Sequence, residues 1–379
     1  MLALAVIFWA SLVALAWTHV LYPVFIEAWA RLRPRRVRAD DVTPRVALVI
    51  AAHDEEQVIE AKLRNALALD YPRDRLRIIV ASDASSDRTD EIVRSFVDRG
   101  VELSACPRGG KVNAQNLTVR AIDDVEILVF SDANCMWQPD ALRRLMRPYA
   151  DPEVAYACGR LRLRAADGTN QEGAYWRYEL KLRDAESRAG SITGGNGSIY
   201  SIRRERYEDV DPRFGHDLSF PYLMVKRGFR AVYVSDAIAD EKPSTDLEDE
   251  FRRKVRMFGH CWLLVFRGRM FGLRKLGPLY WLQMISHRLL RYASGLLHVA
   301  LLASSAALAY TQGGIYLAVL IGQGLFALLV VASVLTRGRV RLLALPHYYL
   351  LVTWATLVAL AEVLTHGVPA TWGKAEGTR

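Results

Sequence analysis

The sequence predicts an α/β domain with a mostly parallel sheet, set between membrane-spanning helices. Two observations lead to this fold class. Hydrophobic residues make up 51% of the 379 residues and charged residues 24%, yet residues 1–30 contain one charged side chain, Glu27, and residues 293–336 contain none. The polar middle, residues 40–245, alternates short apolar runs with helical patterns, which indicates strand–helix–strand units.

The amino-terminal segment, from Met1 to about Tyr22, is long enough to cross a bilayer, which takes about 20 apolar residues per helix. Five arginines follow it, at positions 31, 33, 35, 36 and 38. A cleaved signal peptide is the alternative, but such a peptide carries its positive charge before the apolar run. Residues 1–30 therefore predict a transmembrane helix, and the arginines predict that the chain after it is cytoplasmic.

Three more transmembrane helices are expected in residues 293–366. The charge-free stretch is long enough for two, with a turn at 311–314, and the last runs from about Pro346 to Leu364.

Basic residues set the expected orientation of these helices. Arg337, Arg339 and Arg341 place the loop before the last helix in the cytoplasm. With four crossings and a cytoplasmic middle, the tail, residues 367–379, is then expected outside, although its own basic residues oppose that placement. The pattern predicts a multi-pass protein of the cell (inner) membrane with a cytoplasmic middle.

Residues 246–292 combine apolar and basic side chains and predict amphipathic helices in the membrane interface. The net charge is +9 and the pI about 9.4. Most of the surplus flanks apolar segments, so attraction to anionic lipid explains it. The expected partner is therefore the lipid bilayer and not nucleic acid, for which no recognition motif is present.

Within residues 40–245, strands are expected at the apolar runs and helices between them. The expected strands are 46–52, 76–82, 101–105, 126–131 and 199–202, and the expected helices are 55–69, 87–97, 111–122 and 215–227. Right-handed connections would build a mostly parallel sheet, in which ligands bind at the carboxyl ends of the strands.

Carboxylates stand at these strand ends. Asp83 and Asp132 directly follow buried apolar strands, where a carboxylate is costly unless it is paired or bound to a metal. Hard oxygen ligands beside a diphosphate suit Mg²⁺ or Mn²⁺. No G-x-G-x-x-G or phosphate-loop motif follows a strand, which argues against a dinucleotide oxidoreductase or an NTPase.

Five short motifs occur in the order and at the spacing seen in family 2 glycosyltransferases. They are Ala51-Ala52-His53-Asp54-Glu55-Glu56, Asp70-Tyr71-Pro72, Ser82-Asp83-Ala84-Ser85-Ser86-Asp87-Arg88-Thr89, Gly110-Lys111 and Ser131-Asp132-Ala133-Asn134. The chain further resembles the membrane-embedded branch with cellulose, chitin and hyaluronan synthases, and bacterial exopolysaccharide and chitooligosaccharide transferases. The resemblance implies a GT-A (Rossmann-like) domain that binds a nucleotide-diphosphate sugar.

The resemblance also implies roles for single residues on the donor side. Asp83 would contact the base, Lys111 and Glu55 would bind the nucleotide sugar, and Asp132 would reach a Mg²⁺ or Mn²⁺ ion. The family usually shows D-x-D at this point. Here the second position is Asn134, which offers a carbonyl oxygen to the metal but no charge.

On the acceptor side, the resemblance places Gly194, Gly195 and Asn196 beside the acceptor, where bare backbone lets a sugar approach; a flexible turn is the alternative. Asp217 matches the family's general base, which deprotonates the acceptor hydroxyl. The family reads E-D at this point, and His216 replaces the Glu next to the acceptor.

Residues 253–257 match the family's Q-x-x-R-W. Arg253 and Arg256 would bind the nucleotide sugar, because a guanidinium suits phosphate; a purely membrane-surface role is the alternative. Met257 replaces the Trp that lies under the acceptor sugar in processive relatives, and a Met cannot stack in the same way on a sugar face. The sequence therefore favours transfer but leaves processive polymerisation open.

The expected function is inverting transfer of a sugar to a glycan hydroxyl at the cytoplasmic membrane face, in polysaccharide or exopolysaccharide synthesis, with a UDP-sugar as the expected donor. One alternative is transfer of a single sugar to a lipid or polyprenyl-linked acceptor. Another is a catalytically silent subunit that binds glycan or nucleotide sugar. Because the trailing spans make a narrow bundle, a second copy of the chain or an export partner is a further expectation.

Overall fold

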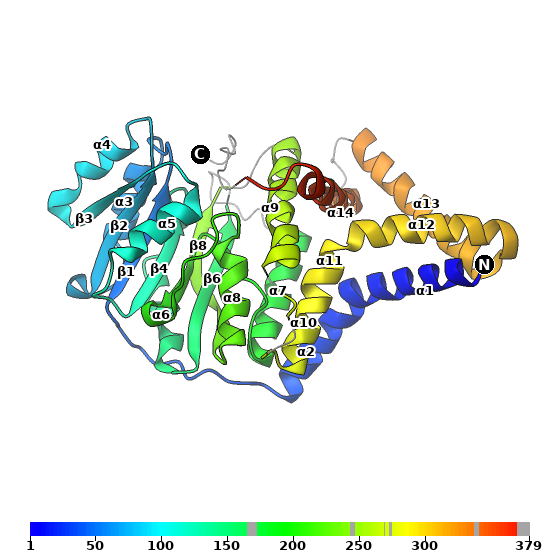
Figure 1. Ribbon diagram of the computed structural model, residues 1–379, viewed down its shortest axis with the longest axis horizontal. Helices are drawn as coiled ribbons and strands as arrows, with labels where there is room; N and C mark the ends of the chain where they lie inside the picture. The colour runs from blue at the N-terminus through cyan, green and yellow to red at the C-terminus, as the bar shows by residue number, and fades with distance from the viewer. Residues whose placement is uncertain (165–172, 243–246, 269, 273–274, 337–340, 370–379) are drawn as a thin grey trace.

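The computed structural model describes residues 1–164, 173–242, 247–268, 270–272, 275–336 and 341–369. A sheet domain forms one part of the molecule, and apolar helices extend from it on one side (Figure 1). The sheet has eight strands in the order β3-β2-β1-β4-β7-β6-β8-β5. The strands are β1 (Val46–Ala52), β2 (Leu76–Asp83), β3 (Val101–Cys106), β4 (Ile127–Asp132), β5 (Met136–Trp137), β6 (Val154–Leu163), β7 (Tyr200–Arg203) and β8 (Arg230–Glu241).

The sheet is mixed. Strand β1 pairs in parallel with β2 and β4, and β2 pairs in parallel with β3. Strand β7 is antiparallel to both β4 and β6, β6 is parallel to β8, and β5 is antiparallel to β8. Parallel pairing brings the carboxyl ends of β1, β2 and β4 to one edge of the sheet. Asp83 ends β2 and Asp132 ends β4, so both residues lie at this edge, on either side of β1.

Helices cover both faces of the sheet. On one face lie α3 (Ile59–Leu67), α4 (Thr89–Arg94) and α6 (Ala141–Met146), and on the other lie α5 (Lys111–Arg120), α7 (Ala174–Ala189) and α8 (His216–Lys226). Helix α3 shows why the sequence folds this way, because Ile59, Leu63 and Ala66 recur at helical spacing and are buried against the strands. The layers form the α/β domain that the sequence predicts.

Every expected strand and helix of the domain is present, with small shifts at the ends. The helix expected at 55–69 begins only at Ile59, because the chain turns at Asp54, whose φ is +51°. Strands β6 and β8 and helix α7 are not among the predicted elements. The β6–β8 pair contains a register shift between Gly159 and Arg160. This shift interrupts the alternation of side chains along the strand, from which a strand is predicted.

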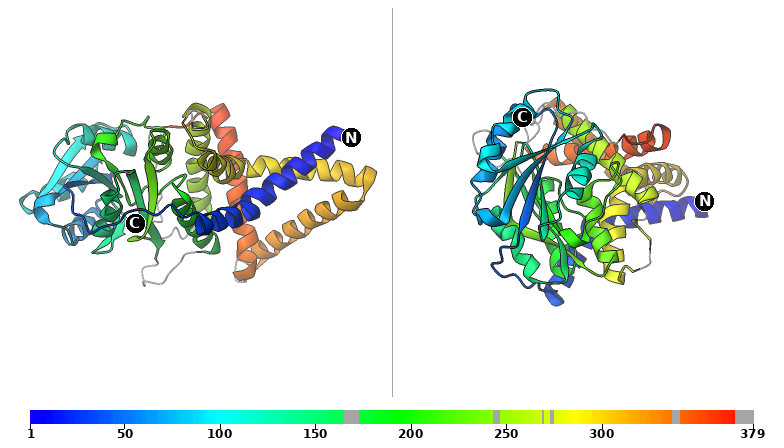
Figure 2. Two further views of the ribbon diagram at one scale, coloured as in Figure 1. Left: turned by 90° about the horizontal axis from the view of Figure 1, so that it is seen from below. Right: turned by 60° about the vertical axis from the view of Figure 1, so that its left-hand side comes forward.

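Within the part of the chain that the structure describes, four helical segments are long and apolar enough to cross a membrane: Leu2–Leu32, Ser294–Gln312, Gly314–Leu335 and Leu343–Thr365. They correspond to the four predicted spans. The first consists of α1 (Leu2–Ala16), a π-helical turn (Trp17–Leu21) and α2 (Tyr22–Leu32), and the others are α12 (Ser294–Gln312), α13 (Gly314–Leu335) and α14 (Arg341–Thr365). Figure 2 shows α1, α12 and α13 extending away from the sheet, whereas α14 runs across their direction.

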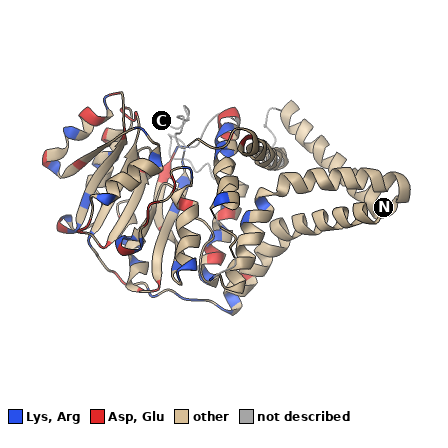
Figure 3. Cartoon of the chain, viewed as in Figure 1, with Lys and Arg blue, Asp and Glu red and all other residues tan. Residues whose placement is uncertain are grey.

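The segment predicted to be amphipathic contains α9 (Leu247–Arg267), α10 (Pro278–Gln283), a π-helical turn (Met284–Leu289) and α11 (Leu290–Tyr292). Helix α9 lies between the sheet domain and α14 (Figure 1). Helices α1, α12 and α13 contain no charged residue, whereas the sheet domain and the connecting helices are rich in them (Figure 3). Glu27 and Arg31 of α2 and Glu362 of α14 lie outside these two charged parts. The charge pattern therefore divides the molecule along its long axis.

Candidate active site

Asp83, at the end of β2, anchors a loop at the carboxyl edge of the sheet. Its Oδ1 accepts hydrogen bonds from the backbone N–H groups of Gly109 (2.7 Å) and Gly110 (3.0 Å), and its Oδ2 pairs with Arg108. The carboxylate is 3% exposed. Its charge is balanced within the protein, and the loop it holds leads directly into α5 and Lys111.

Lys111 and Asp132 meet at this edge. Lys111 Nζ forms an ion pair with Asp132 Oδ1 and also donates to the carbonyl of Gly197 (3.1 Å). The side chains are 17% and 29% exposed, so both can be reached from solvent. The sequence places these two residues 21 positions apart, and the parallel strands bring them together.

Glu241, at the end of β8, is a third carboxylate of the site and was not predicted. Ser198 Oγ lies 3.3 Å from Asp132 Oδ2 and 3.4 Å from Glu241 Oε2, so one hydroxyl bridges the two carboxylates. Asn134 Nδ2 donates to Glu241 Oε1 at 3.4 Å. Burial, and next the charge of Asp132, raise the pKa of Glu241. Like Asp83 and Asp132, Glu241 is a carboxylate at the end of a strand, and this position is the sequence feature that identifies it.

These residues fit a divalent cation. Two carboxylates and an amide provide hard oxygen ligands, and a cation between Asp132 and Glu241 would relieve the like-charge repulsion that raises the pKa of Glu241. Within the described ranges, no cluster of three or more His, Cys, Asp or Glu side chains could hold a metal by itself. The remaining ligands would have to come from water or from the diphosphate of a donor.

A buried lysine supports the chain just after β4. Lys62 is 1% exposed, and its Nζ donates to Ser131 Oγ (2.7 Å) and to the carbonyl of Cys135 (2.5 Å). Burial lowers the pKa of Lys62 to about 8, while the nearby Asp132 opposes that change. The amine thus fixes both ends of the turn that carries Asp132 and Asn134.

Glu55 lies on the neighbouring turn after β1. It is 8% exposed, and its backbone N–H donates to Thr89 Oγ1 at 2.7 Å. Asp54 Oδ1 accepts from the backbone N–H of Ser86 at 2.6 Å. These bonds join the motif at 51–56 to the motif at 82–89, along one edge of the candidate site.

The glycine-rich loop, residues 192–198, has little room for side chains. A Cβ on Gly195 would lie 2.2 Å from Tyr156 Oη, and a Cβ on Gly194 would lie 2.4 Å from a terminal nitrogen of Arg288. Asn196 is buried; its Nδ2 donates to the carbonyl of Gly159 (2.7 Å), and its Oδ1 accepts from the N–H of Ile199 (2.9 Å). Asn196 therefore holds the loop together, and its amide is not presented to an acceptor.

Asp217 lies in the first turn of α8, and the glycine-rich loop is tied to it, because the N–H of Gly195 donates to its backbone carbonyl at 2.7 Å. Asp217 and Asp132 both raise the pKa of the buried phenol of Tyr200, after the larger effect of burial. The same loop also reaches Lys111, whose Nζ donates to the carbonyl of Gly197 at 3.1 Å. The glycine-rich loop therefore links Asp217 to Lys111 and Asp132 at the carboxyl edge of the sheet.

His216 points into the core, in contrast to the predicted acceptor contact. It is 3% exposed, its Nδ1 lies 3.0 Å from Tyr200 Oη, and its Nε2 lies 3.3 Å from Asn116 Oδ1. Burial, with a smaller effect of Lys111, lowers the pKa of His216 to about 3, so the ring is neutral near pH 7. Both nitrogens are satisfied by the protein, which leaves none for a direct bond to an acceptor.

Helix α9 carries the predicted basic motif along the edge of the site. Arg253 donates from Nε to Glu250 Oε2 at 2.9 Å, and both Glu250 and Glu241 raise its pKa against the effect of burial. Burial, and then the charge of Arg253, lower the pKa of Arg256. The methionine at position 257 is 42% exposed. Arg253 is thus electrostatically coupled to the carboxylates, and Met257 faces outward.

A second polar cluster lies behind the glycine-rich loop and was not predicted. Glu186 of α7 is fully buried, and it accepts hydrogen bonds from Tyr22 Oη (2.6 Å) and Thr193 Oγ1 (3.0 Å). His287 Nδ1 lies 2.8 Å from the same carboxylate, and Arg288 Nε donates to Thr193 Oγ1 at 3.0 Å. We call Tyr22, Glu186, Thr193, His287 and Arg288 the buried polar network. It joins α2, α7 and the π-helical turn before α11 to the loop beside Asp217.

Comparison with known proteins identifies the family. The model of the family "Glycosyltransferase like family 2" matches residues 44–259, which is more than half of the chain. The chain belongs to glycosyltransferase family 2 and is a glycosyltransferase with a GT-A fold.

Two curated relatives illustrate the family. An N-acetylglucosaminyltransferase of Rhizobium meliloti is 28% identical over 235 residues, which cover 56% of this chain and 54% of the relative. A beta-monoglucosyldiacylglycerol synthase of a Synechocystis species is 31% identical over 165 residues, which cover 41% of this chain and 33% of the relative. The chain therefore matches about half or less of the length of these relatives.

Among solved structures, the mannosyltransferase PcManGT from Pyrobaculum calidifontis, in complex with GDP-Man and Mn²⁺, is similar to nearly the whole chain. The TM-score is 0.71 at 22% identity, covering 96% of this chain and 97% of the other. At this identity the likeness concerns the fold, and it includes the apolar helices as well as the sheet domain.

Proposed function

We propose that this glycosyltransferase catalyses an inverting transfer from a nucleotide-diphosphate sugar, a UDP-sugar in the first instance, to a hydroxyl at the cytoplasmic face of the cell membrane. The observation that carries the proposal is the meeting of Lys111, Asp132 and Glu241 at one sheet edge, which the glycine-rich loop links to Asp217. The names of the relatives and the GDP-Man of the structural neighbour support a nucleotide-sugar donor.

The chain's own residues divide the reaction into two tasks. On the donor side, Asp83 and its loop bind the nucleoside, while Lys111 and the arginines of α9 offset the negative charge of the diphosphate. On the acceptor side, the Asp217 carboxylate accepts the proton of the acceptor hydroxyl, whose oxygen attacks the anomeric carbon from the face opposite the leaving nucleotide. The C–O bond to the acceptor forms as the bond to the diphosphate oxygen breaks.

A divalent cation, Mg²⁺ or Mn²⁺, would be held by Asp132, Glu241 and the carbonyl oxygen of Asn134. It would supply Lewis-acid stabilisation of the leaving diphosphate. For that role the amide of Asn134 would turn its oxygen toward Asp132, since its nitrogen faces Glu241 in this structure.

The acceptor is proposed to be membrane-associated, either a glycan or a lipid-linked hydroxyl compound. Transfer of a single sugar is favoured by Met257, because no aromatic ring at this position can support a growing chain. One relative is named a beta-monoglucosyldiacylglycerol synthase, and this name supports a lipid acceptor.

Nucleotide release tests the proposal. Detergent-purified protein is offered UDP-, GDP- and TDP-sugars with Mg²⁺ or Mn²⁺, with membranes as acceptor. We expect release from one donor, and a loss on the order of 10²–10⁴-fold in Asp217→Asn, the range for losing a positioned base. The matched control is Asp209→Asn, a surface aspartate paired with Arg120.

Two results would contradict the proposal. One is an Asp217→Asn variant as active as Asp209→Asn. The other is no release from any donor, which would favour a subunit that only binds sugar. Product length on a gel then separates single transfer from polymerisation.

A further inference from the structure

Helix α14 is long and apolar enough to cross a membrane, but its contacts place both of its ends near the sheet domain. Tyr348, near its start, donates to Glu250 Oε1 of α9 at 3.2 Å. Near its middle, the Trp262 indole donates to the carbonyl of Thr356 at 3.1 Å. A Cβ on Gly259 would lie 3.8 Å from Val363 and 3.7 Å from Val368. Helix α14 thus packs against α9 near its start, its middle and its end.

Helix α9 itself is fixed to the sheet domain. His260 Nδ1 lies 2.6 Å from the carbonyl of Arg213, and Tyr222 of α8 donates to the carbonyl of Gly268 at 2.9 Å. Its first turns carry seven charged side chains, at positions 248, 249, 250, 252, 253, 254 and 256. A segment with this charge density does not enter the hydrocarbon core. Helix α9 therefore lies at the membrane surface, and α14 lies beside it.

Contacts between α14 and α12 show where α14 lies along the long axis of the molecule. A Cβ on Gly295, in the first turn of α12, would lie 2.5 Å from Leu357 and 2.8 Å from the carbonyl of Thr353. The middle of α14 is therefore level with the beginning of α12. The other end of α12 packs with α1, through Leu308 and Phe8, and α14 does not extend to that end (Figure 2).

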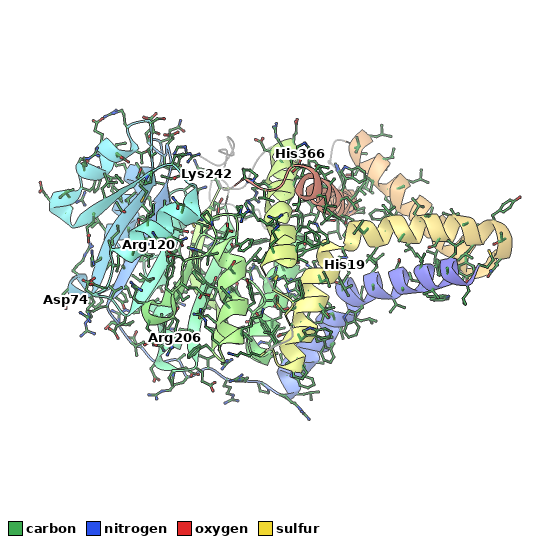
Figure 4. All side chains as sticks on the ribbon, in the orientation of Figure 1. His19, Asp74, Arg120, Arg206, Lys242 and His366 are labelled. Carbon is green, nitrogen blue, oxygen red and sulfur yellow. The ribbon has the colours of Figure 1, made fainter. Side chains whose placement is uncertain are left out.

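The carboxyl end of α14 also remains beside the sheet domain. Val363, His366 and Val368 line one hollow of about 470 Å³ together with Leu263 and Arg213, which precedes α8. Figure 4 labels His366 next to α9, and labels His19 where α1 meets the other apolar helices.

The two faces of α14 differ in the way an interfacial helix requires. Val352, Ala355 and Ala359 are buried against α9. On the opposite face, Leu350 and Trp354 are 41% and 54% exposed. An apolar face turned away from a charged neighbouring helix fits a lipid surface.

We propose that α14 is an interfacial helix, which rests with α9 on the membrane surface at the side of the sheet domain. Of the described helices, three then cross the bilayer: the Leu2–Leu32 segment, α12 and α13. Residues 366–369 then stay on the side of the sheet domain, whereas the predicted topology puts the chain after the last helix on the outside.

Labelling of single cysteines tests the inference. His366→Cys is compared with Glu60→Cys in the sheet domain and with Thr311→Cys at the far turn, using a membrane-impermeant maleimide on intact cells and on inverted vesicles. The four native cysteines are buried, so the unchanged chain serves as the blank. We expect His366→Cys to react in the same preparation as Glu60→Cys and not with Thr311→Cys. Labelling together with Thr311→Cys would overturn the inference.

Depth measurements provide a second test that does not depend on reagent access. Spin labels at Leu350, Trp354 and Leu364, each introduced through cysteine, report depth in vesicles of phosphatidylglycerol and phosphatidylethanolamine. An interfacial helix predicts the same shallow depth at all three positions. A crossing helix predicts that depth changes steadily along the series and passes the bilayer centre. Neither test depends on the proposed reaction, so failure of the proposed transfer and failure of this inference are distinguishable.

Discussion

The proposed donor edge, formed by Asp83, Lys111, Asp132 and Glu241, and the buried polar network use the same kinds of side chain in opposite ways. At the donor edge, Lys111 and Asp132 are 17% and 29% exposed, and Asp132 shares one hydroxyl with a second carboxylate. In the network, Glu186 is 0% exposed and the side chain of His287 is 3% exposed. The first group is open to a ligand, whereas the second is satisfied from within the protein.

This difference separates function from stability. An open, like-charged pair such as Asp132 and Glu241 gains from binding a cation. A closed network such as that around Glu186 gains nothing from a ligand, but it loses much if one member is removed, because the others are left buried without partners. The predictions below use variants that affect one region and spare the other.

The largest effect is expected at the donor edge. Asp132→Asn removes a charge from the proposed metal site, and we expect nucleotide release to fall on the order of 10²–10³-fold, while the melting temperature in detergent stays near that of the wild type. Asp124→Asn is the matched control, since it lies just before the same strand, at the other edge of the sheet, and pairs with Arg77 on the surface. Equal activity of the two variants would remove Asp132 from the site.

In the network, Glu186→Ala should mainly reduce stability. It leaves Tyr22, Thr193 and His287 without their shared acceptor, which we expect to lower the free energy of unfolding by about 3–5 kcal/mol. Thermal unfolding in detergent measures this. The control is Asp184→Asn on the exposed side of α7, which pairs with Arg188 and should cost less than about 1 kcal/mol. If both variants melt alike, the network is not what stabilises this region.

The glycine-rich loop lies between the two regions. Gly195→Ala brings a Cβ within 2.2 Å of Tyr156 Oη, and we expect a loss of about 1–3 kcal/mol in stability. Adding Tyr156→Phe removes the clashing oxygen and should recover part of the loss. Gly173→Ala, where a Cβ meets nothing within 4 Å, is the control. A double variant no more stable than Gly195→Ala alone would show that the contact with Tyr156 is not the cause.

The last prediction concerns pH, and its effect on stability is close to zero at pH 7. The pKa of His216 is about 3 in the folded chain against an ordinary value of 6.5, because the ring is buried. The unfolded chain binds this proton below pH 6.5 and the folded chain does not, so the group favours unfolding as the pH falls from 6.5 toward 3. Its contribution reaches about 1.4 kcal/mol per pH unit. We expect His216→Gln to flatten the acid side of the stability profile, and an unchanged slope would contradict the burial of a neutral ring.

The sequence brings out the position of Asp83, Lys111 and Asp132 because Asp83 and Asp132 follow continuous apolar strands; their roles toward a donor stay a prediction. Asp83, Lys111 and Asp132 stand in short motifs, and the parallel arrangement of the strands brings them together. Glu241 escapes prediction because its strand, β8, is irregular beside β6. Glu186 escapes because one carboxylate on a helix looks like a solvated position until the helices are packed.

Two other features depend on packing in the same way. His216 follows a motif that suggests an acceptor contact, but the aromatic rings around Phe130 and Tyr200 draw it into the core. Hydropathy shows that α14 is long and apolar enough to cross a membrane. It does not show how the helix is oriented relative to the other apolar helices, because that orientation depends on its contacts with α9.

Binding of UDP in the presence of Mn²⁺, measured by titration calorimetry on the wild type, Glu241→Gln and Asp217→Asn, tests the central claim most directly. We predict that Asp217→Asn binds as the wild type does, because it acts on the acceptor, while Glu241→Gln binds on the order of 10-fold or more weakly and loses its dependence on Mn²⁺. GDP and TDP take the place of UDP if the wild type prefers them. Equal Mn²⁺-dependent binding by Glu241→Gln and the wild type would contradict the assignment of the donor edge.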